Sequence, residues 1–190
     1  MSGAIGILGG AFDPPHNGHV ALAREAVAHF RLERLLVRVV ADPGHKEVDT
    51  TPALRLELAE LAFASLAVAE VALDPFARTF DSLEALGLED PVFILGADEL
   101  AAFPSWVRPD RVLDLARIGA ATRPGTDLAD LERVVASLSR PDRIELFPIA
   151  PLPVSSSEVR ERVSAGLRIV DLVPPAVASA IERLGLYRAA

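Results

Sequence analysis

Two histidines near the start of the chain stand three residues apart, in a stretch that also holds paired glycines and paired prolines. The stretch reads Gly9-Gly10-Ala11-Phe12-Asp13-Pro14-Pro15-His16-Asn17-Gly18-His19 and follows an apolar run typical of a first strand. Adjacent glycines let the backbone approach a ligand closely, and the start of a following helix offers unpaired N–H groups and a partial positive charge. At this spacing both imidazoles can lie on one side and donate hydrogen bonds to phosphate oxygens. The string predicts an anion site.

The alternative for the same string is a tight turn whose histidines are helix caps or solvated loop residues. For one histidine that alternative is the better one, but few arrangements need all of these residues so close together, so we favour the anion site for the whole string. Two familiar nucleotide loops are excluded. The chain has no G-x-x-x-x-G-K-[ST] string, and Gly6-Ile7-Leu8-Gly9-Gly10 does not fit G-x-G-x-x-G, which disfavours P-loop hydrolases and ordinary dinucleotide dehydrogenases.

Composition narrows the possible functions further. The chain has 190 residues, 51% of them hydrophobic, no cysteine and a formal net charge of -8. This length predicts a single domain over 1–190, and the lack of cysteine excludes a disulfide framework, a thiolate nucleophile and Cys-ligated zinc. The acidic charge argues against a nucleic-acid partner, which would need clustered Lys and Arg. With no basic leader and no long apolar run, we expect a soluble, cytoplasmic protein without a membrane partner; the oligomeric state leaves no signal.

Short β-branched runs alternate with segments of helical period along the chain, which indicates a Rossmann-like α/β fold: a parallel sheet with helices on both faces. The candidate strands are Ile5–Leu8, Leu35–Val40, Ala69–Leu73, Val92–Leu95, Ile118–Thr122 and Ile144–Phe147. The candidate helices lie near His19–Phe30, Pro52–Ala67, Asp81–Leu86, Asp110–Leu115, Asp127–Ser139, Ser156–Ala165 and Pro174–Leu184. In such sheets ligands bind beyond the carboxyl ends of the strands, so the site is expected in the loops that follow them.

The glycine-histidine string resembles the G-G-[TS]-F-D-P-x-H-x-G-H signature of the HxGH nucleotidyltransferase superfamily, and its form is similar to that of bacterial nicotinate mononucleotide adenylyltransferases. The resemblance implies a fold of the nucleotidyltransferase type and catalytic roles for His16 and His19. It also implies that one group of residues lines the ATP site: Gly9, Gly10, Ala11, Phe12 and Gly18. Ala11 stands where the family usually has a hydroxyl residue, so one phosphate contact is expected to be absent.

A second motif opens a late helix, Val154-Ser155-Ser156-Ser157-Glu158-Val159-Arg160. Ser155 and Glu158 have capping-box spacing, which alone indicates only a well-made helix start. The string also resembles the family's I-S-S-T-x-x-R motif. The resemblance implies that Ser155, Ser156, Ser157 and the catalytic Arg160 contact ATP phosphates, and that the helical part from about 155 completes the ATP site. Arg123, in a string that resembles the family's R-P-G, is expected near the adenine.

Three further segments resemble the acceptor side of the family's site. Phe93–Leu100 with Phe103-Pro104-Ser105-Trp106 resembles F-I-x-G-x-D-x-L…F-P-x-W, which implies that Asp98 binds the acceptor and that Trp106 stacks on its pyridine ring. His45-Lys46 occupies the place of P-H-K, which implies an acceptor contact for His45 and a catalytic role for Lys46. Arg78 and Thr79 fall in the segment that resembles P-S-Y-T-x-D-T-L, with Arg78 in place of Tyr. Each of these residues also has a structural alternative. Asp98 can be an acid at a helix N-terminus that interacts favourably with the helix dipole, and Trp106 can be a partly buried packing residue. Lys46, Arg78 and Arg123 can be solvated surface charges.

Taken together, the resemblance implies transfer of the adenylyl group of ATP to nicotinate mononucleotide, giving deamido-NAD and pyrophosphate. The nucleophile is already a phosphate anion, so alignment and charge from His16, His19, Lys46 and Arg160 are expected to suffice. No carboxylate cluster for a metal is evident, so Mg²⁺ is expected to be held by the ATP phosphates and water. The alternatives are an adenylyltransferase acting on nicotinamide mononucleotide or pantetheine phosphate, or a nucleotide-binding module without turnover.

Overall fold

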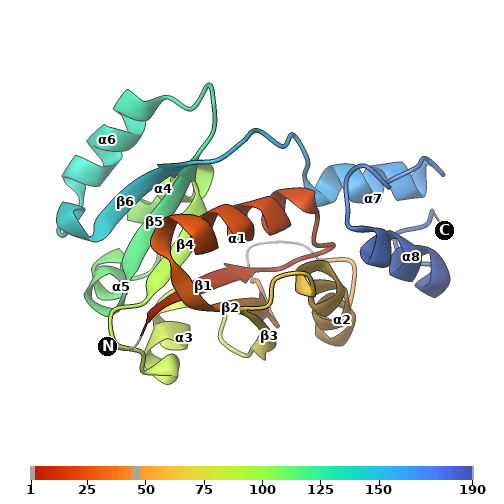
Figure 1. Ribbon diagram of the computed structural model, residues 1–190, viewed down its shortest axis with the longest axis horizontal. Helices are drawn as coiled ribbons and strands as arrows, with labels where there is room; N and C mark the ends of the chain where they lie inside the picture. The colour runs from red at the N-terminus through yellow and green to blue at the C-terminus, as the bar shows by residue number, and fades with distance from the viewer. Residues whose placement is uncertain (1–2, 45–47, 190) are drawn as a thin grey trace.

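A six-stranded sheet forms the centre of the molecule, and each neighbouring pair of its strands is parallel (Figure 1). The computed structural model describes residues 3–44 and 48–189. The strands run in the order β3-β2-β1-β4-β5-β6 across the sheet. Their bounds are β1 Ala4–Gly10, β2 Leu32–Val40, β3 Ala69–Asp74, β4 Val92–Gly96, β5 Arg117–Thr122 and β6 Ile144–Pro148.

The inner strands are apolar on both sides because helices cover both faces of the sheet. In β1, Leu8 lies in one hydrophobic cluster and Ile7 in the other. In β2, Val37 lies in the same cluster as Leu8, and Leu36 lies in the same cluster as Ile7. Side chains of a strand alternate between its faces, so continuous apolar runs place apolar residues against both helical layers.

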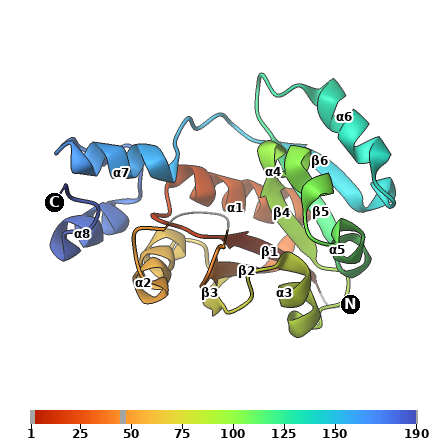
Figure 2. The same cartoon turned by 180° about the vertical axis from the view of Figure 1, so that it is seen from behind.

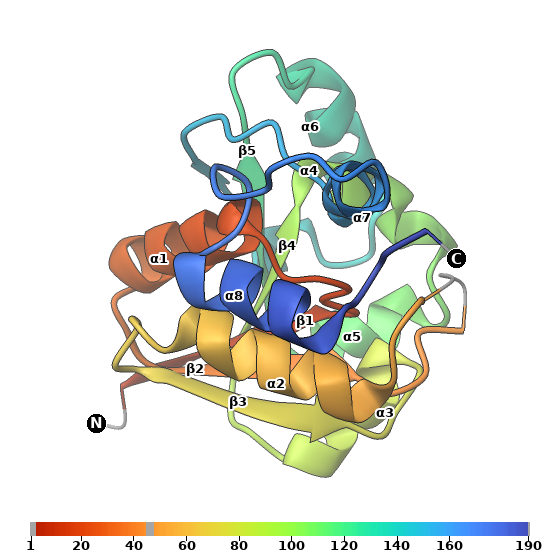
Figure 3. The ribbon, with the colours of Figure 1, turned by 90° about the vertical axis from the view of Figure 1, so that its right-hand side faces the viewer.

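One helical layer contains α1 (Asn17–Phe30), α2 (Pro52–Phe63), α7 (Ser156–Ser164) and α8 (Pro175–Leu184), all of which contribute to the first cluster. The other layer contains α3 (Thr79–Leu86), α4 (Ala97–Ala102), α5 (Pro109–Leu115) and α6 (Leu128–Ser137). Figure 2 shows α3 and α5 on the side away from α1. Two short 3-10 helices, η1 (Phe103–Ser105) and η2 (Pro141–Arg143), precede α5 and β6. Helix α8 runs along α2 and closes the end of the molecule near the start of α1 (Figure 3).

The strand order reverses between β1 and β4, which lie side by side at the centre of the sheet. A chain reversal of this kind opens a crevice at the carboxyl ends of the two strands. The fold class expected from the sequence is confirmed, since all six candidate strands form. The helices differ from the candidates in several places: α4 was not among them, α2 ends at Phe63 rather than near Ala67, and α1 and α3 each begin two residues earlier than expected. Within the described residues, no helix combines the length and the apolar character needed to cross a membrane.

Candidate functional site

The glycine-histidine string forms the loop between β1 and α1, at the point where the strand order reverses. Gly9 and Gly10 end β1, and a Cβ on Gly10 would lie 3.0 Å from the Phe12 ring. Phe12 has a left-handed backbone (φ 51°), and its side chain is buried. Ligand contact by Phe12 would therefore come from its backbone. The carbonyl of Ala11 accepts a hydrogen bond from Arg55.

His16 and His19 lie together at the start of α1. Their rings stack with centroids 3.7 Å apart and an angle of 28° between the planes. His16 is the N-cap residue, and its backbone N–H donates to Nδ1 of His19 over 3.2 Å. A Cβ on Gly18 would lie 3.0 Å from the His16 ring, so the glycine lets the ring sit close to the helix backbone. The expected pairing of the two imidazoles is thus present.

Burial sets the protonation state of His16. The residue is 8% exposed, and burial together with the positive charge of Arg123 lowers the pKa of its imidazole from 6.5 to about 4. Its buried Nδ1 has no hydrogen-bond partner among the residues that the structure describes. The expectation that His16 supplies positive charge needs correction, because desolvation disfavours the imidazolium. At neutral pH His16 offers a neutral imidazole, and the effect of Arg123 on it places that exposed arginine close enough to act on the same site.

The start of α7 lies against this loop. Ser155 is the N-cap and accepts a hydrogen bond from the Glu158 backbone N–H at 3.1 Å, as its capping-box spacing predicts. Ser156 Oγ donates to the Pro14 carbonyl at 2.9 Å. Arg160 Nη1 donates to the Asp13 carbonyl at 2.8 Å, and its Nη2 lies 3.4 Å from Ser157 Oγ. Two motifs more than 130 residues apart in the sequence thus meet at one edge of the sheet.

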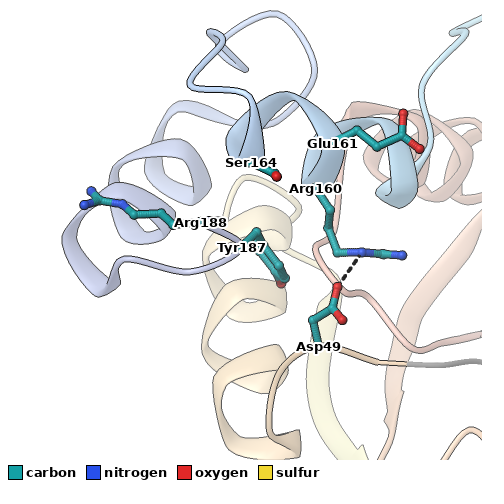
Figure 4. A pocket seen from close by; sticks show the side chains of 6 residues that line it. All are labelled: Asp49, Arg160, Glu161, Ser164, Tyr187 and Arg188. Atoms are coloured by element: carbon teal, nitrogen blue, oxygen red, sulfur yellow. Dashed lines mark ion pairs between the residues drawn. The ribbon is translucent and has the colours of Figure 1, made fainter. Parts of the chain in front are cut away.

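An acidic partner of Arg160 was not expected from the sequence. Asp49 Oδ2 lies 2.7 Å from Arg160 Nε, and the pair stands beside a hollow of about 490 Å³ (Figure 4). The hollow is lined by Asp49, Arg160, Glu161, Ser164, Tyr187 and Arg188. Two oxygen acceptors, the Asp49 carboxylate and the Asp13 carbonyl, therefore hold the Arg160 guanidinium in place at the site. An isolated aspartate in a loop carries no sequence signal that would single it out.

A buried arginine, Arg55, is the second residue that sequence reasoning missed. It is fully buried (0% exposed), and its guanidinium donates to the carbonyls of Ala11, Val40 and Ala41 at 2.7 to 2.9 Å, with a longer contact of 3.4 Å to Thr50. Arg55 thereby ties α2 to the loop after β1 and to the end of β2. Its place in α2 gave no hint of burial, because arginine is rarely buried.

The expected acceptor residues follow β3 and β4. Asp98 lies exposed in the first turn of α4, directly after β4. Trp106 is half-buried and packs against Phe103 and Phe93, with ring centroids 5.1 and 6.2 Å away. Arg78 is the exposed N-cap residue of α3, and Thr79 begins that helix. All four stand at the same edge of the sheet as the histidines, while contact with an acceptor remains a proposal. His45 and Lys46 lie outside the described residues.

Comparison with known proteins places the chain in a family. The family model described as cytidylyltransferase-like matches residues 7–162. A relative from Roseiflexus sp. (strain RS-1), named "Probable nicotinate-nucleotide adenylyltransferase", is 39% identical over 98% of this chain and 99% of its own length. A protein of the same name from Thermomicrobium roseum is 35% identical over 97% of this chain and 91% of its own length.

Solved structures show the same fold. The Plasmodium falciparum nicotinic acid mononucleotide adenylyltransferase complexed with NaAD aligns with a TM-score of 0.78 and 19% identity, covering 98% of both chains. The same enzyme complexed with APC aligns with a TM-score of 0.77 and 18% identity over the same shares. The family match and the full-length relatives together show that this chain belongs to the cytidylyltransferase-like proteins and, within them, to the nicotinate-nucleotide adenylyltransferase family.

Proposed function

We propose that this protein transfers the adenylyl group of ATP to nicotinate mononucleotide, releasing pyrophosphate and forming deamido-NAD. The observation that carries the proposal is the meeting of two motifs: the stacked His16–His19 pair and Arg160, which donates to the Asp13 carbonyl of the same loop. The names of the full-length relatives support nicotinate mononucleotide as the acceptor over pantetheine phosphate.

In the proposed reaction, a phosphate oxygen of the acceptor attacks the α-phosphorus of ATP. One P–O bond forms there, and the bond from the α-phosphorus to the pyrophosphate oxygen breaks, so pyrophosphate leaves with the electron pair. No protein base is needed, because the attacking oxygen already carries negative charge. His16 and His19 would donate hydrogen bonds to phosphate oxygens whose charge changes during transfer. Arg160 would supply fixed positive charge and align the triphosphate.

The remaining ATP contacts are proposed from the positions of residues near His16, His19 and Arg160. The backbone of Gly9–Phe12 and the first turn of α7, with Ser155 and Ser157, would receive phosphates at the sheet edge. Ser156 Oγ is already committed to the Pro14 carbonyl, so a ligand would meet its backbone N–H. Arg123 would act near the adenine or the phosphates. The residues from about 155 onward would thus complete the ATP site, as expected for one domain.

Mg²⁺ is proposed to arrive on the ATP phosphates. Over 3–44 and 48–189, no three His, Asp or Glu side chains gather in a group that could hold a metal ion. The carboxylate nearest to the two histidines in the sequence, Asp13, already accepts three hydrogen bonds from the protein. The magnesium chemistry would be charge neutralisation on the triphosphate, with water completing the coordination.

The direct test supplies the purified chain with ATP and Mg²⁺ and one of three acceptors: nicotinate mononucleotide, nicotinamide mononucleotide or pantetheine phosphate. Pyrophosphate release should be fastest with nicotinate mononucleotide. Faster turnover of another acceptor would assign the chain to that reaction, and ATP binding without turnover of any acceptor would make it a binding module.

Two variants test the assigned roles. His19→Ala should lower kcat on the order of 10² to 10³, the usual loss for a donor acting on transition-state charge. His29→Ala is the matched control, because His29 lies on the same helix but pairs with Glu145 away from the site. Arg160→Lys keeps the charge and loses the planar fork, so it should raise the KM for ATP much more than the KM for the acceptor.

A further inference from the structure

A carboxylate inside the histidine loop is buried and is held by donors from two distant parts of the chain. Asp13 is 3% exposed. Its Oδ1 accepts hydrogen bonds from the Tyr187 hydroxyl and from Thr50 Oγ1, each at 2.7 Å, and its Oδ2 accepts from the Asp49 backbone N–H at 2.6 Å. A buried carboxylate is costly unless its oxygens have partners. These three donors therefore fix Asp13 relative to both the segment at 49–50 and the C-terminal tail.

The same aspartate controls Arg160 through two contacts. Its carbonyl accepts directly from Arg160 Nη1 at 2.8 Å. Its carboxylate holds the backbone of Asp49, whose own side chain lies 2.7 Å from Arg160 Nε. The guanidinium is thus anchored at Nε and Nη1, with a longer contact from Nη2 to Ser157 Oγ, while each Nη atom carries a second N–H for a ligand. Displacing Asp13 or Asp49 would change the direction in which those groups point.

Tyr187 is built to stay in this position. It follows α8, whose C-cap residue Gly185 is left-handed, and it has a left-handed backbone itself (φ 59°), which is uncommon for a bulky residue. Its ring packs against the first hydrophobic cluster. Burial and the hydrogen bond to Asp13 raise the pKa of the Tyr187 hydroxyl far above its ordinary value, so the group remains a donor. Figure 4 shows its side chain beside the hollow that Asp49 and Arg160 also line.

We infer that Tyr187, in the C-terminal tail, is a positioning residue for ATP binding: its hydroxyl holds the Asp13 carboxylate, and through Asp13 and Asp49 it sets the direction of Arg160. The inference rests on the proposed function, in which Arg160 binds the ATP phosphates. It assigns the tail a role in the reaction although Tyr187 itself would touch neither substrate.

The test compares Tyr187→Phe with wild type in the full-length chain. This variant keeps the ring and loses only the hydroxyl. The KM for ATP and the ATP dissociation constant from calorimetry should both rise on the order of tenfold, the loss typical of a hydrogen bond to a charged group. The KM for the acceptor should change by less than about twofold, because the contacts of Asp13 orient Arg160, which is proposed to bind ATP and not the acceptor. Arg183→Ala is the matched control, because Arg183 lies on the neighbouring helix α8 and forms an exposed ion pair with Glu57 outside the hollow; it should leave both constants unchanged.

A second variant tests whether Tyr187 acts through the Asp13 carboxylate. Thr50→Val removes the other donor to the same Asp13 oxygen and should also raise the KM for ATP. Because both changes act through one carboxylate, the double variant should raise it by less than the product of the two single effects. Multiplicative effects would mean that the two residues act separately and would overturn the inference.

A purely structural tyrosine would behave differently. Tyr187→Phe would then lower the Tm while leaving both KM values unchanged or raising them together, and either pattern overturns the inference. Tyr187 is also the only tyrosine in the chain, so absorbance near 295 nm reports it alone. If the Tyr187 hydroxyl of the folded protein ionises with the ordinary tyrosine pKa of about 10, it does not donate to Asp13, and the inference is overturned. If wild type binds ATP but turns over no acceptor, the proposed reaction fails while calorimetry still decides the role of Tyr187.

Discussion

At the scale of single residues, burial separates His16 from ordinary surface histidines, while the neighbouring His19 is half-buried. The His16 backbone N–H donates to Nδ1 of His19, so while this bond persists a neutral His19 carries its proton on Nε2. His16 is neutral at pH 7 because its imidazole is buried. His16 would then act as a hydrogen-bond donor without a charge of its own, and Arg160 and Arg123 would supply positive charge to the site.

The first prediction concerns the pH dependence of stability. The pKa of His16 is 6.5 in the unfolded chain and about 4 in the folded protein. Between these values the unfolded chain binds a proton that the folded protein does not, so the free energy of unfolding falls as the pH drops through this window. From pH 7.5 to 4.5 wild type should lose roughly 2.5 kcal/mol more than His16→Gln, measured by urea unfolding. Parallel stability curves for the two proteins would contradict the low pKa.

At the scale of elements, the turn between β3 and α3 is held by a buried carboxylate. Asp74 is 4% exposed, and it accepts hydrogen bonds from the Phe76 backbone N–H at 3.0 Å and from Ser82 Oγ at 2.5 Å. These contacts join the end of the strand to the second turn of the helix. They fix the start of α3, and with it Arg78 and Thr79, at the edge of the sheet where the acceptor is proposed to bind.

The second prediction separates stacking from selectivity on this acceptor side. Trp106 can hold a nicotinate or a nicotinamide ring equally, so Trp106→Ala should weaken both mononucleotides by about the same factor. Arg78→Ala should weaken the nicotinate form selectively, by about tenfold, because only that form carries a carboxylate for the guanidinium. Arg108→Ala is the control, since Arg108 is an exposed N-cap arginine whose guanidinium instead lies over the Phe80 ring. The readout is the ratio of kcat/KM for the two acceptors. An unchanged ratio in Arg78→Ala would leave selectivity to backbone N–H groups near Thr79.

The sequence predicts elements well where a local pattern repeats and poorly where it does not. Six apolar runs predict six strands, and all six form; the four inner strands β2, β1, β4 and β5 are covered on both faces. Helix α4, Ala97–Ala102, spans less than two turns, too short for a helical period to be recognised. Helix α1 begins at Asn17 rather than near His19, because His16 is its N-cap, a role that the residue type does not announce.

At the scale of the whole molecule, the contacts that complete the site join residues far apart in the chain. The histidine loop and the α7 start each have a motif, so their meeting follows from the resemblance. The hydrogen bond from Tyr187 to Asp13 spans 174 residues and has no local signature. The burial of Arg55 is equally hidden, because only the packed fold surrounds the guanidinium with carbonyl oxygens. Such contacts depend on tertiary packing and could not be read from the sequence.

The third prediction tests the role of Arg55 in holding the molecule together. Arg55→Met keeps most of the side-chain volume and removes the guanidinium donors to the partly buried carbonyls of Ala11, Val40 and Ala41. Three hydrogen bonds from a charged donor are lost, so the free energy of unfolding should fall by about 3 kcal/mol, measured by urea titration. Arg34→Met removes an arginine whose partner, Glu70, is solvent-exposed, and the loss there should be much smaller. Equal losses in the two variants would show that the Arg55 contacts add little.

The central claim is that the acceptor phosphate attacks the α-phosphorus of ATP at the edge where the histidine loop meets α7. Its most direct test supplies ATP labelled with ³²P at the α-position together with nicotinate mononucleotide and Mg²⁺. The label should move into deamido-NAD, the released pyrophosphate should be unlabelled, and His19→Ala should slow the transfer on the order of 10² to 10³. Label that stays in ATP or appears only in AMP, or a His19→Ala variant that transfers it at the wild-type rate, would contradict the account.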